Sequence, residues 1–152
     1  MKKAAGILPY KIENGQPLFF IVHPGGPFWK HKDLGSWSIA KGEFEDPEIA
    51  LQAAIREFEE ETGVKLEGDF SELSAVKLKS GKVIFAWSIL QDLDASSITS
   101  NTFETEWPPK SGKMQSFPEV DKAGWFDAAT AIEKINPAQA QFIREVVSHL
   151  QR

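Results

Sequence analysis

The sequence predicts a single domain of the mixed α/β (α+β) class that spans residues 1–152. Three observations support this prediction: a hairpin-like apolar pattern near the N-terminus, one clear amphipathic helix in the middle of the chain, and further strand and helix patterns after it. The length of 152 residues suits one domain with a real core, and a hydrophobic fraction of 41% with a charged fraction of 26% is ordinary for a globular protein. The sequence contains no internal repeat and no linker.

The first two predicted strands form a hairpin. Residues 4–11 alternate weakly between apolar and polar side chains, and residues 17–23 form the continuous apolar run that is typical of a buried strand. Asn14 and Gly15 between them are a turn signal. We therefore expect two neighbouring strands at the start of the chain.

A segment rich in proline and glycine follows over residues 24–35. Its two prolines and three glycines argue against regular structure, so the simplest interpretation is a surface loop. Because the segment also contains Phe28, Trp29 and several basic side chains, a second interpretation is a loop that closes over a flat, anionic ligand. Alternation returns over residues 36–41 and predicts a further strand.

The clearest helix in the sequence covers about residues 47–62. Asp46 is a favourable N-cap, Pro47 suits the first helical position, and Gly63 suits the position just after the last turn. The apolar residues of this segment recur at helical spacing, so one face is expected to pack on the core. They are Leu51, Ala54, Ile55 and Phe58.

Strands and irregular segments are predicted to alternate after this helix. Residues 70–79 and 83–90 have the pattern of two strands, and the Ser80-Gly81 pair between them is a turn signal. Residues 92–115 show no regular pattern and are expected to be irregular.

The C-terminal part is predicted to hold one short strand and two helices. Residues 123–126 have the pattern of a strand, and residues 128–135 that of a brief helix. Asn136 and Pro137 then cap a final helix over about residues 137–151. The apolar positions of this last helix follow helical spacing, so it is expected to pack on the body of the domain.

Composition narrows the possible functions. The chain has no cysteine, which excludes disulfides, thiolate zinc sites and a cysteine nucleophile. The N-terminal apolar run breaks at Pro9, and no later stretch is long enough to span a bilayer, so we expect a cytoplasmic protein with no membrane partner. A formal net charge of −5 argues against duplex nucleic acid but permits a small anionic partner. Both a monomer and a homodimer stay open.

Three glutamates share one side of the central helix. Glu57, Glu60 and Glu61 are spaced i, i+3 and i+4, which places their carboxylates on adjacent turns. Like charges at this spacing destabilise a helix by about 0.2–0.5 kcal/mol per pair, and a divalent cation would reverse that effect. Oxygen ligands without cysteine favour magnesium, manganese or calcium over zinc or copper. The alternative interpretation is an acidic face that contacts only solvent.

The same helix lies within a longer pattern. It reads Gly42, five residues, Glu48, seven residues, and then Arg56-Glu57-Phe58-Glu59-Glu60-Glu61-Thr62-Gly63-Val64. This pattern resembles the signature of the Nudix hydrolases at every defined position. The resemblance implies an α/β/α sandwich around a mixed β-sheet, in which the signature forms a loop-helix-loop motif. It also implies a hydrolase that depends on Mg2+, with Mn2+ as a possible substitute, and that cleaves a phosphoanhydride bond in a nucleoside-diphosphate-linked compound.

The resemblance also implies roles for particular residues. Matched by position, Glu57, Glu60 and Glu61 would be the metal ligands. The backbone carbonyl of Lys41 or of Gly42 would be a further ligand.

Three more side chains receive roles in this way. Arg56 is expected to hold carboxylates in place, with Glu60 as a partner one turn away; the alternative is an ordinary surface ion pair. Glu48 would support the structure. Glu119 resembles a glutamate that reaches the metal cluster or acts as base in RNA pyrophosphohydrolases and dinucleoside polyphosphate hydrolases, although it could also be a surface carboxylate. The general base would be Glu57 or Glu119.

The substrate is less well defined than the reaction. The stretch 37–43 resembles the sequence that precedes the signature in diadenosine tetraphosphate hydrolases, but Ala40 stands where those enzymes have proline. The tyrosine that they carry after the signature is also missing, because the only tyrosine is Tyr10. The stretches 23–29, 100–104 and 107–109 resemble a bacterial subgroup of predicted nucleoside triphosphate pyrophosphohydrolases.

The expected small-molecule nucleotide therefore has several candidate identities. Dinucleoside polyphosphates and nucleoside triphosphates come first; an RNA 5′-end pyrophosphohydrolase and a non-catalytic nucleotide sensor are the alternatives. Substrate contacts are expected from the lysines Lys41, Lys110 and Lys113 to distal phosphates and from Trp107 or Trp29 to a base.

Overall fold

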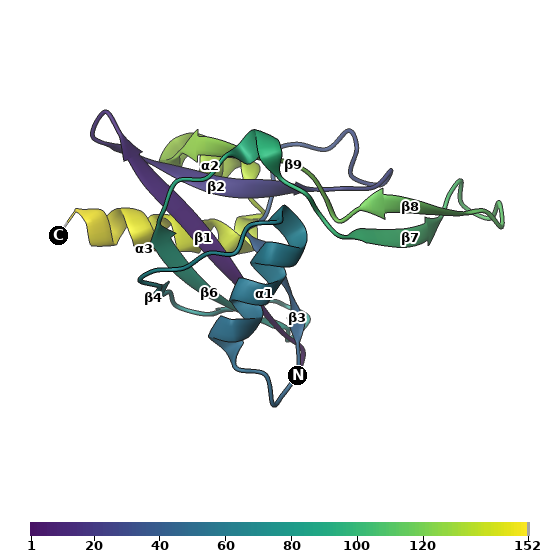
Figure 1. Cartoon of the computed structure of the whole chain (residues 1–152), viewed down its shortest axis with the longest axis horizontal. Helices are drawn as coiled ribbons and strands as arrows, with labels where there is room; N and C mark the ends of the chain where they lie inside the picture. Colours follow the sequence, from purple (N-terminus) through teal and green to yellow (C-terminus); the bar gives the residue numbers. More distant parts are fainter. Residues whose placement is uncertain (152) are drawn as a thin grey trace.

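A mixed β-sheet lies at the centre of the structure, a computed structural model that describes residues 1–151 (Figure 1). The strands of this sheet are β1 (Lys3–Glu13), β2 (Gln16–Pro24), β3 (Ala40–Phe44), β4 (Ser71–Glu72), β5 (Val76–Lys77), β6 (Val83–Leu90) and β9 (Val120–Asp127). They lie in the order β4-β6-β1-β2-β9, with β3 paired to β1 and β5 paired to β6. The pairing of β1 with β6 is parallel, and the others are antiparallel.

The predicted N-terminal hairpin is confirmed. β1 and β2 pair antiparallel, with Tyr10 opposite Phe19. Asn14 and Gly15 between the strands have φ values of 52° and 78°. Both values are positive, which suits the tight turns that join neighbouring strands and explains why asparagine and glycine stand there.

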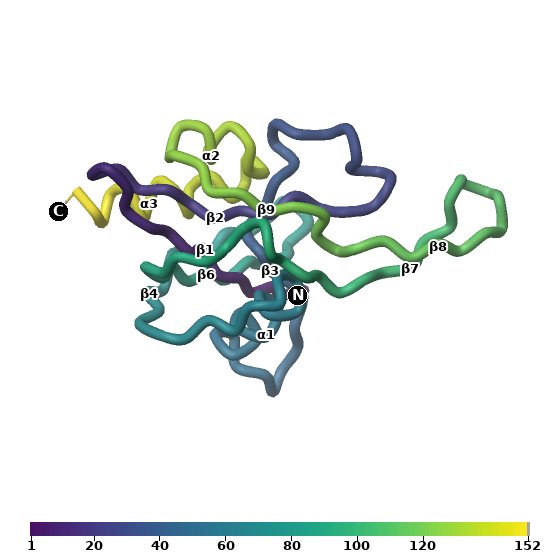
Figure 2. Tube along the Cα trace, turned by 45° about the horizontal axis from the view of Figure 1, so that its top comes forward, coloured from purple at the N-terminus to yellow at the C-terminus, as the bar shows by residue number. Residues whose placement is uncertain are grey.

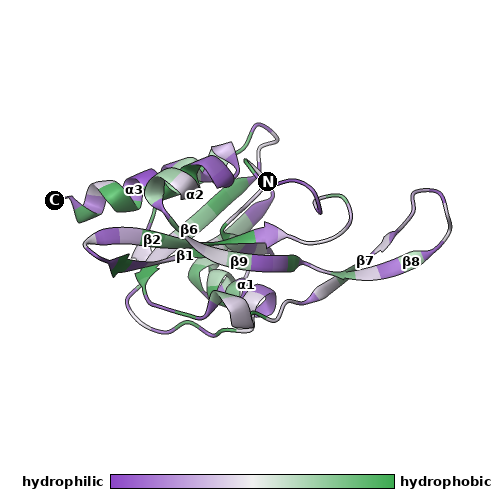
Figure 3. Ribbon diagram, turned by 90° about the horizontal axis from the view of Figure 1, so that it is seen from above, coloured by the Kyte–Doolittle hydropathy of each residue, from purple (hydrophilic) through white to green (hydrophobic). Residues whose placement is uncertain are grey.

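Helices cover both faces of the sheet (Figure 3). The helix α1 (Ala50–Thr62) packs on one face, and the helices α2 (Ala128–Lys134) and α3 (Ala140–Leu150) pack on the other. Neighbouring residues of β2 divide between the two cores, because side chains alternate along a strand: Phe19 contacts the core under α2 and α3, whereas Phe20 contacts the core under α1. The mixed sheet and the α/β/α layering expected from the resemblance are therefore confirmed.

The start of α1 differs from the prediction. Asp46 does not cap the helix and Pro47 is not its first residue; the N-cap is Ile49, which is extended and has no side-chain cap bond. Asp46 instead forms an ion pair with Nζ of Lys3 at 2.7 Å. The end of α1 is confirmed, since Gly63 is left-handed with φ 80° and donates its backbone N–H to the carbonyl of Glu59.

Two of the later strand predictions need correction. The predicted strand over residues 36–41 begins only at Ala40, where the chain starts to pair with β1; before it there are only isolated bridges such as Val22 to Ser38. The predicted strand over residues 70–79 is reduced to β4 and β5, two short pieces that pair with different parts of β6. The prediction for residues 83–90 is confirmed by β6.

The segment predicted to be irregular contains a second, separate hairpin. After a short 3-10 turn η1 (Ala95–Ser97), the strands β7 (Thr102–Glu106) and β8 (Met114–Pro118) pair antiparallel. Figure 2 shows this hairpin extending beyond the main sheet. Its side chains are exposed or half-buried, so the apolar pattern that identifies a core strand is absent from its sequence.

The C-terminal predictions are confirmed. β9 contains the predicted strand, and α2 follows it with Asp127 as its N-cap, accepting a hydrogen bond from the backbone N–H of Thr130. Asn136 caps the 3-10 turn η2 (Pro137–Gln139), which leads directly into α3. None of the helices described over residues 1–151 has the length and apolar character needed to cross a membrane.

Candidate active site

A polar cleft of about 430 Å3 lies where α1, β3 and the base of the β7–β8 hairpin meet. Five carboxylates line it, and two lysines and three further residues complete its wall. Every glutamate of the expected metal site faces this cleft. The lining residues are Glu43, Glu57, Glu60, Glu61, Glu119, Lys41, Lys82, Gly42, Asn101 and Thr102.

The absence of a side chain at Gly42 lets β3 approach α1. A Cβ at this position would overlap the carboxylate of Glu57. Gly42 is one of the glycines without a positive φ, so backbone conformation does not require glycine there. Glycine is required there because the Glu57 carboxylate lies where the Cβ of any other residue would be.

Glu61 is the most strongly perturbed carboxylate of the cleft. Burial raises its pKa to about 8, the positive charge of Lys41 opposes that rise, and the negative charge of Glu57 adds to it. Its Oε2 atom is buried, and no polar atom within residues 1–151 forms a hydrogen bond with it. A buried oxygen without a partner is costly, and a cation would satisfy it.

Arg56 connects two carboxylates of the cleft to Glu48, which lies outside it. Its Nε and Nη2 atoms donate to the two oxygens of Glu48 at 2.8 and 2.9 Å. Its Nη1 atom donates to Glu57 at 2.9 Å and to Glu60 at 3.2 Å. The guanidinium therefore uses its fixed fork geometry to hold carboxylates, as expected from the sequence, and Glu60 is its partner one turn away.

Burial in the cleft disfavours the charged forms of Glu57 and Lys41. Burial raises the pKa of Glu57, and the charge of Arg56 limits that rise. Burial lowers the pKa of Lys41, and the nearby charge of Lys82 lowers it further. Both carboxylate and ammonium charges are thus poorly solvated here, which is a common property of sites that bind charged ligands.

The hairpin is anchored at the cleft by its two ends. The backbone N–H of Asn101 donates to the carbonyl of Glu60 at 2.8 Å, and the backbone N–H of Glu119 donates to the carbonyl of Asn101 at 2.8 Å. Glu119 therefore lines the same cleft as the helix glutamates, 58 positions later in the chain than Glu61. Its charge contributes to the raised pKa of Glu61.

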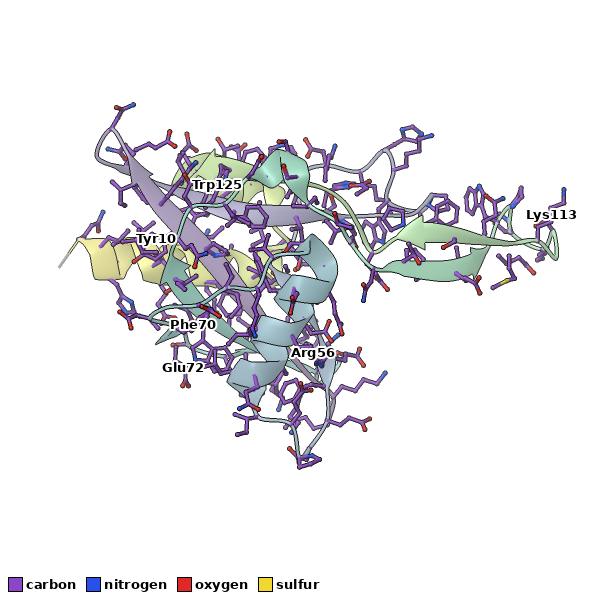
Figure 4. The ribbon with its side chains drawn as sticks, in the orientation of Figure 1. Tyr10, Arg56, Phe70, Glu72, Lys113 and Trp125 are labelled. Carbon is purple, nitrogen blue, oxygen red and sulfur yellow. The ribbon has the colours of Figure 1, made fainter. Side chains whose placement is uncertain are left out.

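Two predicted phosphate contacts lie elsewhere. Lys110 and Lys113 follow β7 at the far end of the hairpin and do not line the cleft, and Figure 4 shows Lys113 far from Arg56. The sequence prediction treated their segment as irregular and so could not place it. Lys41 does line the cleft, and Trp107 and Trp29 lie together in a different groove.

Sequence reasoning missed Lys82 and Asn101. Lys82 reaches the cleft because the next residue, Val83, begins the pairing of β6 with β1, and its backbone N–H donates to the carbonyl of Lys2. The Nζ atom of Lys82 forms an ion pair with Glu43 at 3.0 Å. No local pattern marks Lys82, and Asn101 lies in the stretch 100–104, whose resemblance to a family subgroup gave it no role in the site. The pairing of β1 with β6 brings Lys82 to the helix glutamates, and a backbone hydrogen bond to Glu60 brings Asn101 there.

The cleft fits a divalent cation, although the side chains do not form a complete cage. Within residues 1–151, no group of three or more histidine, aspartate and glutamate side chains is already arranged to hold a metal ion. Magnesium usually takes one or two carboxylates and completes its shell with water and substrate phosphate. The Oε2 atom of Glu61, which has no hydrogen-bond partner among residues 1–151, and the Glu57 carboxylate that lies against Gly42 suit that behaviour. Chemically, such a cleft can hold a cation, position a water and accept a proton.

Comparisons with known proteins agree with this geometry. The family model described as NUDIX domain matches residues 2–146. The structure of a C. elegans Ap4A hydrolase binary complex is 21% identical with a TM-score of 0.64, and the match covers 99% of this chain and 98% of that one. The NUDIX domain of Shewanella oneidensis NrtR, solved with ADP ribose, is 16% identical with a TM-score of 0.64, over 97% and 87% of the two chains.

A structure from work on MutT of Aliivibrio salmonicida and Vibrio cholerae is similar as well. It is 16% identical with a TM-score of 0.56, and the match covers 97% of this chain and 96% of that one. At these identities the solved structures establish a shared fold. No curated protein sequence matches the chain.

Proposed function

This chain belongs to the NUDIX family, and we propose that it is a metal-dependent pyrophosphohydrolase that cleaves a phosphoanhydride bond in a nucleotide. The observation that carries the proposal is the cleft in which Glu57, Glu60 and Glu61 meet Glu119 and two lysines. A surface helix with an acidic face would have solvated carboxylates. Here Oε2 of Glu61 is buried and has no hydrogen-bond partner in the described part of the chain, and Arg56 holds the carboxylates of Glu57 and Glu60.

Mg2+ is the proposed cofactor, with Mn2+ as a substitute. Its ligands would be Glu57, Glu60, Glu61 and a backbone carbonyl from Lys41 or Gly42. When bound, a magnesium ion neutralises phosphate oxygens and lowers the pKa of a bound water. The donors are all oxygens, which magnesium prefers.

The protein's own groups would do the remaining work. Arg56 keeps the carboxylates of Glu57 and Glu60 in place through the hydrogen bonds from its Nη1 atom. Lys41 and Lys82, at the wall of the cleft, would attract the phosphates and orient them toward the carboxylates.

A carboxylate next to the attacking water would accept its proton. Glu57 and Glu119 are the two candidates. Burial raises the pKa of Glu57, which makes it a better base than a solvated glutamate. Glu119 comes from the hairpin side of the cleft and is not held by Arg56.

Nucleoside triphosphates and dinucleoside polyphosphates are the proposed substrates. An Ap4A hydrolase structure has the same fold over almost the whole chain, and a MutT structure does as well, which supports these classes without choosing between them. RNA 5′-ends are a further candidate, supported by the position of Glu119 in the cleft. A nucleotide sensor is the non-catalytic alternative.

The test is a substrate panel assayed with Mg2+, Mn2+ and EDTA. Nucleoside triphosphates, dinucleoside polyphosphates, nucleotide sugars and triphosphorylated RNA are compared by release of phosphate or pyrophosphate. We expect turnover of at least one nucleotide that requires the metal and disappears with EDTA. Tight nucleotide binding without turnover of any panel member would instead identify a sensor.

A further inference from the structure

A buried histidine lies where β2, β9 and the loop after β2 meet. His23 is the last residue but one of β2 and is 0% exposed. The other two histidines of the chain, His31 and His149, are exposed. The indole ring of Trp37 packs edge-to-face with the imidazole ring of His23, and the ring centroids are 5.3 Å apart. A buried polar ring needs hydrogen-bond partners, and those of His23 belong to separate parts of the fold.

Both ring nitrogens of His23 face oxygen acceptors. Nδ1 lies 2.8 Å from Oδ1 of Asp121, and Nε2 lies 2.6 Å from the backbone carbonyl oxygen of Lys32. A neutral imidazole has one N–H, so it would leave the lone pair of the other nitrogen against an oxygen in a buried site, which is costly. The doubly protonated ring donates to both oxygens and pairs its charge with the carboxylate of Asp121.

The charged groups around this ring come from β9, the loop and α2. They are Asp121 and Lys122 on β9, Lys32 and Asp33 in the loop, and Lys134 on α2. Asp33 forms an ion pair with Lys134 at 3.0 Å, and the ammonium of Lys32 lies 4.0 Å from the ring centroid of Phe28. Among these groups, the carboxylate of Asp121 is therefore the one that bonds to the imidazole ring.

Asp121 reaches the ring because β9 contains an extra residue at this point. In the pairing of β2 with β9, His23 lies opposite Lys122 and Pro24 lies opposite Val120, so Asp121 has no opposite residue on β2. Such a β-bulge changes the direction of a side chain, and bulges are frequent next to active sites. Here the bulge directs a carboxylate at a buried histidine.

The bulge begins two residues after Glu119, which lines the cleft. The backbone N–H of Glu119 donates to the carbonyl of Asn101 at 2.8 Å, and its carbonyl accepts the backbone N–H of Gly25 at 2.9 Å. The loop after β2 is therefore bonded to this segment twice, once at Gly25 and once through His23 and Asp121. Since Arg56 does not hold Glu119, the place of Glu119 depends on these backbone contacts.

We propose that His23 is a positioning residue for Glu119: its doubly protonated ring connects Asp121 to the loop carbonyl of Lys32 and so fixes the side of the cleft that carries Glu119. This inference rests on the proposed function only for the part that Glu119 takes in hydrolysis. The ring itself does not touch the substrate. It acts through the bulge and the loop that hold the backbone of Glu119.

The first test is NMR of the full chain labelled with [15N]histidine, at pH 6. Ring protons of exposed histidines exchange rapidly with water, whereas buried, hydrogen-bonded ring protons exchange slowly and give signals. We expect two ring N–H signals, one on each nitrogen of His23, that are both missing in His23→Gln, and none from His31 or His149. A single ring N–H signal would show that one of the two contacts is not a bond from His23, and would overturn the proposal.

Two variants each keep one of the two contacts. The amide nitrogen of asparagine can take the place of Nδ1, so His23→Asn keeps a donor for Asp121. The longer side chain of glutamine brings its amide nitrogen to the place of Nε2, so His23→Gln keeps a donor only for the carbonyl of Lys32. The two variants therefore separate the bond to the bulge from the bond to the loop.

Backbone amide exchange measures the effect on the segment that holds Glu119. We expect the amides of Gly25 and Glu119 to exchange at least about tenfold faster in His23→Gln than in His23→Asn. The amide of Leu73, which donates to the carbonyl of Ala86 near the opposite edge of the sheet, should be unchanged and reports that the fold is intact. Equal exchange of Gly25 and Glu119 in the two variants would overturn the proposal.

Kinetics with Mg2+ and the best nucleotide substrate give the second readout. In His23→Gln we expect kcat to fall by about 10- to 100-fold with KM changed by less than about threefold, because a displaced Glu119 affects the chemical step more than substrate binding. His23→Asn should recover most of kcat, and His149→Asn, on the exposed side of α3, is the control. In a Glu119→Gln background, His23→Gln should lower kcat by less than about threefold.

The two proposals fail in different ways. If no nucleotide is hydrolysed, the proposed function is wrong, and the ring and amide signals still decide whether His23 fixes the segment of Glu119. If a nucleotide is hydrolysed but His23→Gln lowers kcat equally with and without the carboxylate of Glu119, His23 has a structural role only and the positioning role is overturned. Wild-type kcat in Glu119→Gln would overturn it as well.

Discussion

The carboxylate of Glu57 occupies the space that a Cβ would fill at position 42, so Gly42 and Glu57 are in direct contact across β3 and α1. This contact places the first helix glutamate beside the backbone of Lys41 and Gly42, the two candidates for a carbonyl ligand. The cleft therefore depends on a residue that has no side chain. Its chemistry can be tested one contact at a time.

Gly42→Ala should abolish most of the turnover and leave the protein folded. Gly42 does not have a positive φ, so alanine fits the backbone, and the added Cβ displaces the Glu57 carboxylate. We expect kcat to fall by roughly 100-fold, which corresponds to the loss of about 3 kcal/mol of metal-assisted stabilisation of the transition state. Far-UV circular dichroism checks the fold. Wild-type kcat in this variant would show that the position of Glu57 does not matter.

Glu60→Gln and Glu61→Gln should each remove most of the activity, whereas Glu59→Gln should not. Glu59 is the matched control because it lies on the same helix, directly before Glu60, but is exposed and outside the cleft. We expect a fall in kcat of roughly 100-fold for the two cleft variants and less than about threefold for the control. Equal losses in all three variants would point to a general effect on the helix.

Arg56→Lys should lower activity through the carboxylates that Arg56 holds. A lysine keeps the charge but cannot bond to Glu48 with two parallel hydrogen bonds and also reach Glu57 and Glu60. We expect kcat to fall by about 10- to 100-fold, as for other groups that orient metal ligands, with more Mg2+ needed for half-maximal activity. Glu48→Gln, which removes only the charge of Glu48, should give a smaller change of the same kind. An unchanged Mg2+ requirement in Arg56→Lys would contradict this role.

Stability of the metal-free protein should fall as the pH rises, and Glu61 should cause part of that fall. Its pKa is raised from 4.5 in the unfolded chain to about 8 in the fold, so the folded state binds the extra proton between these values. The contribution of Glu61 to stability is therefore fully present below about pH 4.5 and is lost as the pH rises through about 8. Glu61→Gln, which stays neutral, should be more stable than the wild type at pH 8.5, by about 1–3 kcal/mol in the free energy of unfolding.

Urea unfolding in EDTA at pH 5.5 and pH 8.5 measures this difference. The gain from Glu61→Gln should be larger at pH 8.5 than at pH 5.5. Glu59→Gln serves again as the control and should show no such dependence, since Glu59 is exposed. A gain from Glu61→Gln that is the same at both pH values would contradict a titration of Glu61 in the folded protein between pH 5.5 and pH 8.5.

Local sequence pattern predicted the parts of the fold in which it is strong. The Asn14-Gly15 turn, the end of α1 at Gly63 and the cap at Asn136 all follow from the conformational preferences of single residues. The start of α1 did not, since the helix begins after Ile49 and Asp46 pairs with Lys3 instead of capping it. A partner 43 residues away is invisible to a local pattern.

The candidate site likewise contains residues that local spacing predicted and residues that only tertiary contacts place there. Glu57, Glu60 and Glu61 share a helix, so spacing alone predicted that they lie together. Lys82 and Asn101 reach the cleft only through strand pairing and through backbone bonds to α1. Lys110 and Lys113 were expected near the phosphates, and the unpredicted hairpin carries them to its far end instead.

The most direct measurement for the central claim is anomalous diffraction from crystals of the protein soaked with Mn2+ and a non-hydrolysable nucleotide. We predict a manganese peak in the cleft, within roughly 2.5 Å of carboxylate oxygens from at least two of Glu57, Glu60 and Glu61, with the phosphates of the nucleotide on the same ion. A nucleotide bound with no manganese at these oxygens, or with manganese held only elsewhere on the protein, would contradict the account.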